Sequence, residues 1–95
     1  MGFLEQLRQS ADELAHWAAE AGKVGAARLE ELAARRRADS LLRELGALTY
    51  AGHTGGEPPD PAEVSRLLAA IEEAEARAEA AARHAEDIAR AAQEP

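Results

Sequence analysis

One short segment of this 95-residue chain carries strong signals against α-helix, and its position limits the fold more than any other feature. Residues 51–60 (Ala-Gly-His-Thr-Gly-Gly-Glu-Pro-Pro-Asp) hold three of the seven glycines and two of the four prolines. Glycine after a run of leucines is typical of a helix C-terminus, and two consecutive prolines cannot continue a helix. The sequence on either side is compatible with helix, so we expect helical stretches joined by one turn.

The start of the helical stretch after this segment is well marked. Asp60 suits the N-cap, Pro61 the first helical position and Glu63 the third position of a capping box. Neither glycine nor proline recurs in the next thirty residues. We therefore expect a loop at 52–60 and a helix, called helix C, at 61–92.

The stretch before the loop contains no proline, and its weak points are Gly22 and Gly25. Glycine in a helix interior costs about 1 kcal/mol relative to alanine, which permits a break without requiring one. We expect helix A at 3–21 and helix B at 26–51. The two are either separate helices or one fused rod.

Helices B and C carry matching apolar rows at coiled-coil spacing, with intervals of three and four residues. Both rows have large side chains near the loop and mainly alanine away from it, so an antiparallel hairpin places like opposite like. Small side chains let the helix axes approach closely. The rows are Ala34, Ala38, Leu41, Leu45 and Leu48 in helix B, and Val64, Leu67, Ile71, Ala74, Ala78, Ala81, Ala85, Ile88 and Ala92 in helix C.

Helix A has an apolar face that the hairpin does not use. Polar residues, among them Glu5, Arg8 and Asp12, occupy its other side. The apolar face needs a cover, which is the hairpin itself in a three-helix bundle, a second copy of the chain, or another protein. The residues predicted to make this interaction are Phe3, Leu4, Leu7, Leu14 and Trp17, on a stripe that includes Ala11, Ala18 and Ala21.

The composition supports an all-α domain. The chain has 25 alanines and 11 leucines but only two valines and two isoleucines, which disfavours a β-sheet. Abundant Ala, Leu, Glu and Arg are typical of long helices and coiled coils. The leucines, valines, isoleucines, one methionine and three aromatic residues are too few for a thick core. The lack of cysteine excludes disulfides and thiolate zinc sites.

The charge pattern bears on the partners. The net charge is −7, and most of the excess acid lies in residues 53–95, so nucleic acid is not an expected partner. No apolar run approaches the about 20 residues of a membrane span. The first residues lack the pattern of a signal peptide. We expect a cytoplasmic protein.

No group of residues points to catalysis, a metal or a cofactor, and we expect none of these. Glu13-x-x-His16 has the spacing of a di-iron ligand pair, but such a site needs a second pair, which this sequence lacks. Arg35, Arg36 and Arg37 spread around a helix rather than forming one patch. We expect them to pair with carboxylates of helix C, with docking to an acidic partner or a phosphate as the alternative.

Three segments resemble a group of small bacterial coiled-coil proteins that usually carry a C-terminal zinc ribbon. Residues 1–4 (Met-Gly-Phe-Leu) open into an amphipathic helix, and an acidic, proline-containing loop leads to a second helix. Residues 41–50 (Leu-Leu-Arg-Glu-Leu-Gly-Ala-Leu-Thr-Tyr) are similar to the group's L-Y-x-E-I-G-x-L-x-Y segment. The resemblance implies a helical hairpin, without the ribbon and its metal because this sequence has no cysteine.

These observations predict a non-enzymatic coiled-coil interaction or scaffolding protein that self-associates or binds a protein partner through helix A. One alternative is a membrane-surface adaptor that uses helix A. Interfacial helices usually display Lys and Arg on the polar face, whereas helix A is mixed, with Glu5 and Asp12 beside Arg8 and Lys23. The other alternative is an acidic regulator that docks on a basic protein through helix C.

Overall fold

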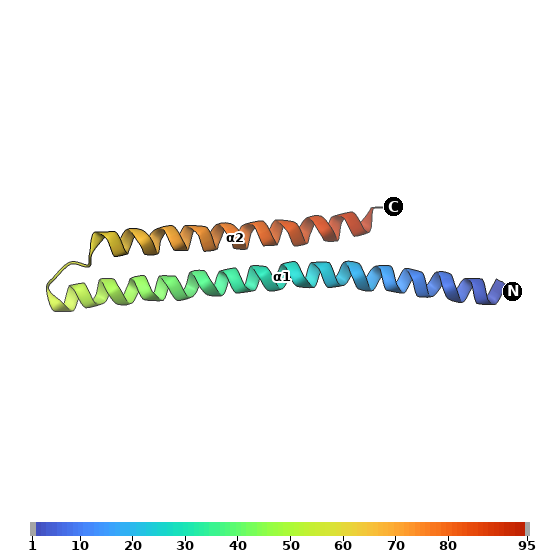
Figure 1. Ribbon diagram of the computed structural model, residues 1–95, viewed down its shortest axis with the longest axis horizontal. Helices are drawn as coiled ribbons and strands as arrows, with labels where there is room; N and C mark the ends of the chain where they lie inside the picture. Colours follow the sequence, from blue (N-terminus) through green and yellow to red (C-terminus); the bar gives the residue numbers. More distant parts are fainter. Residues whose placement is uncertain (1, 95) are drawn as a thin grey trace.

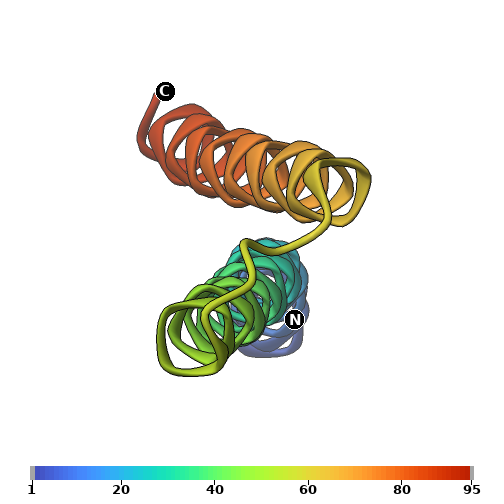
Figure 2. The same ribbon diagram turned by 90° about the vertical axis from the view of Figure 1, so that its left-hand side faces the viewer.

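The computed structural model describes residues 2–94, apart from the side chain of Glu20. Two helices, α1 (Gly2–Gly55) and α2 (Pro61–Gln93), run antiparallel and side by side (Figure 1). The molecule measures 82 × 18 × 14 Å. Figure 2 looks along it from the loop end and shows the two helices as a single layer, one beside the other. The predicted all-α helical hairpin is confirmed.

Helix α1 is continuous through Gly22 and Gly25, so the structure has the fused rod. Helix A extends past the hairpin instead of folding back on it, and the three-helix bundle is not formed. Each glycine weakens the helix by only about 1 kcal/mol, and the surrounding alanines, leucines and charged residues are strong helix formers. The two glycines therefore leave the helix unbroken.

Helix α1 also ends four residues later than the expected end at residue 51, so the loop is shorter. Gly52 and Gly55 both lie within the helix. The chain leaves the helix at Gly56, whose φ of 76° is the left-handed conformation that glycine adopts without steric cost. A glycine does mark the end of the helix, as predicted, but it is Gly56, the third glycine of the segment.

Gly52 has a different role, because the loop folds back against it. A Cβ atom at this position would lie 2.9 Å from the carbonyl oxygen of Glu57 and 2.9 Å from Cδ of Pro59. Both distances are shorter than real side chains tolerate. Gly52 therefore allows the close approach that reverses the chain direction.

Helix α2 begins where the sequence predicts. The side chain of Asp60 accepts a hydrogen bond from the backbone N–H of Ala62 at 3.1 Å. The backbone carbonyl oxygen of Asp60 accepts hydrogen bonds from the backbone N–H groups of Glu63 and Val64. Asp60 is thus the N-cap and Pro61 the first helical residue. The helix ends one residue beyond the expected end at 92.

The seam between the helices follows the predicted rows, because every predicted position is buried or half-buried. The large side chains gather near the loop, where Leu41 and Leu67 are almost fully enclosed. Leu45 and Leu48 pack against this cluster. Farther from the loop the buried positions of α2 are all alanine, which are Ala74, Ala78, Ala81 and Ala85.

The row on α1 continues farther toward the N-terminus than predicted. Ala27 is buried, and Val24 and Glu31 are half-buried, at the same intervals of three and four residues. The sequence analysis missed this extension because Glu31 interrupts the apolar pattern. Val24 thus belongs to the seam.

Leu67 and its neighbour Leu68 provide a matched test of the seam. Leu67 has no exposed surface, whereas Leu68 is 47% exposed. We expect Leu67→Ala to lower the free energy of unfolding by about 2–5 kcal/mol, because it removes buried methyl groups and leaves a cavity. Leu68→Ala should cost well under half as much. Urea unfolding followed by circular dichroism measures both, and equal losses would contradict the packing described.

Close approach of the helices along the alanine part of the seam predicts that enlargement is harmful. Ala78 is 1% exposed, and Ala76 on the same helix is exposed. We expect Ala78→Leu to destabilise the fold by about 1–3 kcal/mol through overpacking. Ala76→Leu is the control and should be close to neutral. A higher melting temperature for Ala78→Leu would mean that the seam is loosely packed.

Candidate interaction surface

The N-terminal part of α1 extends beyond the end of α2 (Figure 1). Residues 2–19 are all exposed, and among the side chains that the structure describes the first half-buried one is Val24. The hairpin therefore leaves helix A uncovered. We call residues 2–19 the overhang.

The five predicted interaction residues all lie on the overhang, and each is between 51% and 72% exposed. At about 100° per residue, Leu4, Leu7 and Leu14 fall within one narrow arc of the helix surface. Phe3 and Trp17 lie along one edge of this arc. The overhang thus presents an apolar strip with an aromatic edge.

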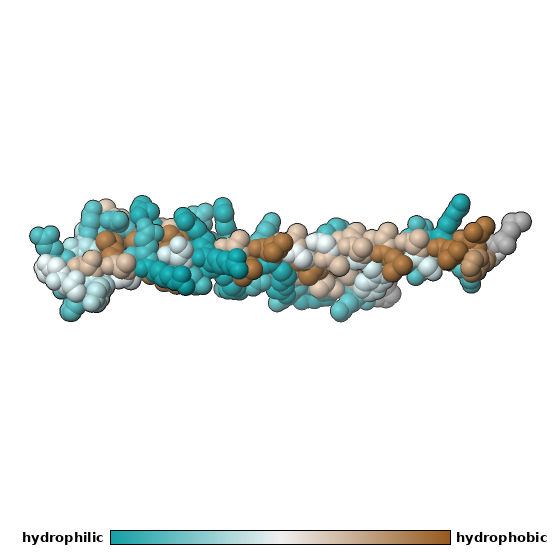
Figure 3. Space-filling model, turned by 90° about the horizontal axis from the view of Figure 1, so that it is seen from below, coloured by the Kyte–Doolittle hydropathy of each residue, from teal (hydrophilic) through white to brown (hydrophobic). Residues whose placement is uncertain are grey.

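The strip does not stop at the end of the overhang, which the sequence analysis missed. Leu29 and Leu32 are exposed on the same side of α1, roughly opposite the seam. Figure 3 views the molecule from the side of α1, and hydrophobic side chains recur along this outer face. The signal was present in the spacing, but helix B was interpreted only through the row that faces α2. We call the whole row the outer strip, and its members are Leu4, Leu7, Ala11, Leu14, Ala18, Gly22, Gly25, Leu29 and Leu32.

The middle of the outer strip consists of small residues, including Gly22 and Gly25. A Cβ atom added at either glycine would meet nothing within 4 Å. The hairpin therefore has no steric need for glycine here, although alanine would favour the helix. The two glycines form a smooth, open section of the α1 surface.

Glu31 is the one carboxylate in the α1 row that faces the seam, and its arginine neighbours hold it there. It accepts hydrogen bonds from Arg28 at 2.7 Å and from Arg35 at 2.9 and 3.1 Å. Its side chain is largely covered. The hydrogen bonds from Arg28 and then Arg35 lower the pKa of Glu31 below its ordinary value. The two arginines thus keep this carboxylate charged beside an alanine-lined seam.

The expected pairing of the arginine run with helix C is wrong for Arg35, whose partner is Glu31 on its own helix. A link between the two helices joins Arg66 of α2 and Glu44 of α1 at 3.9 Å. Both side chains are more than half exposed, so this pair contributes little stability. Apolar packing, rather than ion pairing, holds the hairpin together.

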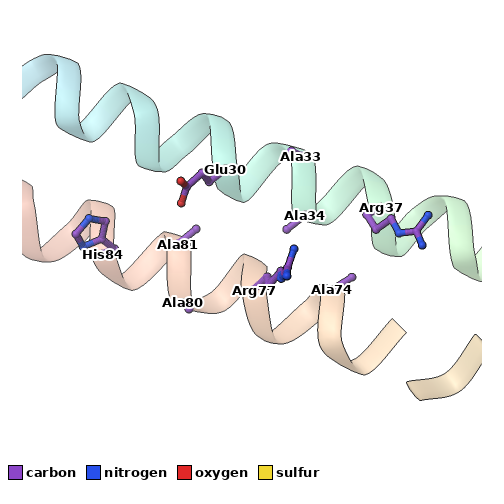
Figure 4. A pocket seen from close by; sticks show the side chains of 9 residues that line it. All are labelled: Glu30, Ala33, Ala34, Arg37, Ala74, Arg77, Ala80, Ala81 and His84. Carbon is purple, nitrogen blue, oxygen red and sulfur yellow. The ribbon is translucent and has the colours of Figure 1, made fainter. Parts of the chain in front are cut away.

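An open groove of about 700 Å³ runs between α1 and α2 where the seam consists of alanine. In Figure 4, Ala34 of α1 and Ala81 of α2 point into the gap from its two sides, and Glu30, Arg37, Arg77 and His84 are arranged around it. The groove lies beside the buried alanines of the seam, with alanines on its floor and longer polar side chains at its edges. The groove is partly open to solvent.

Two further findings concern metals and membranes. No group of three or more His, Asp or Glu side chains lies close enough together to hold a metal ion among the described residues. Glu13 and His16, which have di-iron spacing, are both exposed on the overhang. Neither α1 nor α2, as far as the structure describes them, is long and apolar enough to cross a membrane.

Comparisons of the chain with protein-family models, curated proteins and solved structures give no match. The resemblance to the zinc-ribbon coiled-coil group is thus supported only by the residues that first indicated it. The class that the fold itself defines is a two-helix antiparallel hairpin whose first helix is much longer than its second.

The Glu31 cluster predicts a pH-dependent contribution to stability. Because the pKa of Glu31 is lowered by folding, its ion pairs stabilise the hairpin above the ordinary Glu pKa of about 4.3. This contribution is lost as the pH falls through the lower pKa of the folded state. We expect Glu31→Gln to lower the melting temperature at pH 7, with the difference from the native protein shrinking as the pH falls below the ordinary Glu pKa.

Glu79→Gln is the control for this comparison, because Glu79 is exposed and the substitution changes the net charge equally. It should leave the melting temperature at pH 7 nearly unchanged. If the two variants melted alike at every pH, the Glu31 cluster would have no role in stability.

Proposed function

We propose that this protein is a non-enzymatic coiled-coil interaction protein that acts as a scaffold and self-associates through the outer face of α1. The observation that carries the proposal is the overhang, on which Phe3, Leu4, Leu7, Leu14 and Trp17 are all mostly exposed. Contiguous exposed apolar surface on a protein marks a place where another surface binds. The proposal includes a cytoplasmic location, as the sequence predicts, and cell fractionation checks it.

The energetics of the overhang favour a partner. Residues 2–19 are all exposed, so this part of α1 lacks the tertiary packing that supplies most of the stability of helices in proteins. Burying a leucine side chain fully contributes about 1.5–3 kcal/mol. Covering Leu4, Leu7 and Leu14 would therefore stabilise both the complex and the helix itself. Trp17 at the edge is a suitable anchor, because tryptophan often dominates interface energies.

The two alternative functions that the sequence suggests require different charged surfaces. A membrane-surface adaptor would need cations around the strip, whereas Glu5, Asp12 and Glu13 surround it together with Arg8. An acidic regulator would use the exposed carboxylates of α2. One of these, Glu73, lies 3.6 Å from Arg77 on the same helix, which partly offsets its charge. The overhang therefore supports protein association better than either alternative.

A double variant of the overhang tests the proposal. We expect Leu7→Gln with Leu14→Gln to lower the association state measured by analytical ultracentrifugation, because it removes apolar surface while glutamine keeps the helix. The matched control is Glu13→Gln with His16→Gln, which changes the other side of the same segment and should associate like the native protein. Circular dichroism of all three proteins verifies that the hairpin remains.

Trp17 reports on the same event, because it is the only tryptophan in the chain. We expect its emission to shift to the blue and its quenching by acrylamide to fall as the concentration of native protein rises. A native protein that stays monomeric, with water-like emission from Trp17 throughout, would overturn self-association. Flotation with anionic vesicles would then decide for the membrane-surface alternative, and salt-sensitive binding to a basic protein would decide for the acidic regulator.

A further inference from the structure

We infer that the occupant of the outer strip is a second copy of this chain, packed antiparallel to the first with its two-fold axis at Ala18. This inference rests on the proposed self-association and adds to it the orientation and the register. It is carried by the arrangement of large and small residues on the outer strip, the open space at two glycines and the length of the strip.

The outer strip is self-complementary when two α1 helices run in opposite directions. Residues equally far before and after Ala18 then lie at the same level along the pair. Leucines meet at both ends of the strip, and a leucine or an alanine meets a glycine near the middle. The resulting layers are Leu4 with Leu32, Leu7 with Leu29, Ala11 with Gly25, and Leu14 with Gly22.

The helical geometry also lets the two residues of each layer lie side by side. At about 100° per residue, Leu14 leans toward one edge of the strip and Gly22 toward the other. A two-fold axis perpendicular to the helices keeps each edge on its own side of the interface. Leu14 of one copy therefore lies beside Gly22 of the other, as in the mixed layers of antiparallel coiled coils.

The glycines distinguish this arrangement from a parallel one. Gly22 and Gly25 have open space at the Cβ position in the hairpin, so nothing within the chain accounts for them. In an antiparallel pair they provide room for Leu14 and Ala11 of the other copy. In a parallel pair Gly22 would face Gly22 and leave a void, while Leu14 would face Leu14.

The surroundings of the outer strip fit the same arrangement. Helix α2 packs on the opposite side of α1, so it does not obstruct a second copy. Trp17 lies one residue from the axis, and the two Trp17 side chains would meet along one edge of the interface. Along the other edge, Arg8 of one copy falls within two residues of the level of Glu30 of the other, which is an attractive pair.

The size of the interface predicts its strength. The strip from Leu4 to Leu32 is about 43 Å long at about 1.5 Å per residue, and a helix is about 10 Å wide. Two copies would bury on the order of 1,000 Å² together, at the lower limit for a specific protein interface. We therefore expect a reversible dimer that dissociates on dilution.

Cysteine cross-linking tests the register directly, because the natural chain contains no cysteine. We expect Ala18→Cys to form a disulfide-linked dimer under mild oxidation, since two Cα atoms beside the axis come within the about 4.4–6.8 Å that a disulfide spans. His16→Cys, exposed on the other side of the helix, is the control and should remain mostly monomeric. Leu4→Cys should cross-link to Leu32→Cys when the two proteins are mixed, and neither should cross-link efficiently alone.

Gly22→Ala is a second test, because it should change the helicity of the monomer and the affinity of the dimer in opposite directions. It should raise the helicity of the monomer and weaken the dimer at least tenfold, because the added methyl group occupies the space for Leu14 of the other copy. Gly46→Ala is the matched control, since Gly46 also has open space at Cβ but lies on α1 outside the outer strip. This variant should leave the dissociation constant unchanged.

The outcomes separate the inference from the proposed function. A dimer that is lost on mutation of Leu7 and Leu14, but in which Leu4→Cys cross-links to itself, would overturn the antiparallel register and leave self-association intact. The same holds if Gly22→Ala tightens the dimer. A native protein that is monomeric at its highest soluble concentration would overturn both, and flotation with anionic vesicles would then identify a membrane surface as the occupant.

Discussion

The contact between two alanine-rich faces, fixed at the loop end by a few leucines, is the interaction on which the rest of this structure depends. Leu41 and Leu67 are enclosed between the helices, and the seam continues from them as alanine. Alanine provides little apolar area, but its short side chain lets α1 cover the alanines of α2 from Ala74 to Ala85 almost completely. A stable hairpin therefore results from many small contacts rather than from a thick core.

The small number of large side chains in the seam also affects which apolar residues are exposed on the surface. A single layer of two helices can cover only one face of each helix, so large apolar residues elsewhere must be exposed. On α1 they are numerous and ordered, from Leu4 to Leu32, whereas on α2 the prominent exception is Leu68. The asymmetry between the helices is the physical reason to look for a partner on α1.

Much of the fold could be predicted from the sequence because its signals are local. The N-cap at Asp60, the absence of proline before the loop, and the rows of alternating three and four residues each depend on a few neighbouring positions. The end of α1 at Gly55 could not be predicted as well, because any of three nearby glycines could end the helix. Which of them does so depends on how the loop folds back on Gly52.

The candidate surface was predicted in part. The overhang residues form an evident apolar stripe in the sequence. Leu29 and Leu32 do not stand out as its continuation, because the spacing in helix B also fits the row that faces helix C. The seam was likewise cut short at Ala34, since Glu31 does not resemble a core residue. Its place there depends on two hydrogen-bonding arginines, which become visible only when the side chains are positioned.

Because α1 is continuous, it acts as a spacer of fixed length. An unbroken helix fixes the distance between its two ends at about 1.5 Å per residue, so the loop lies about 56 Å from Ala18. Two such rods joined antiparallel at that residue would hold their loops about 110 Å apart and facing in opposite directions. Anything attached at the loops would be kept at a set separation, and inserting or removing helical turns in α1 would change that separation in steps of about 5.4 Å per turn.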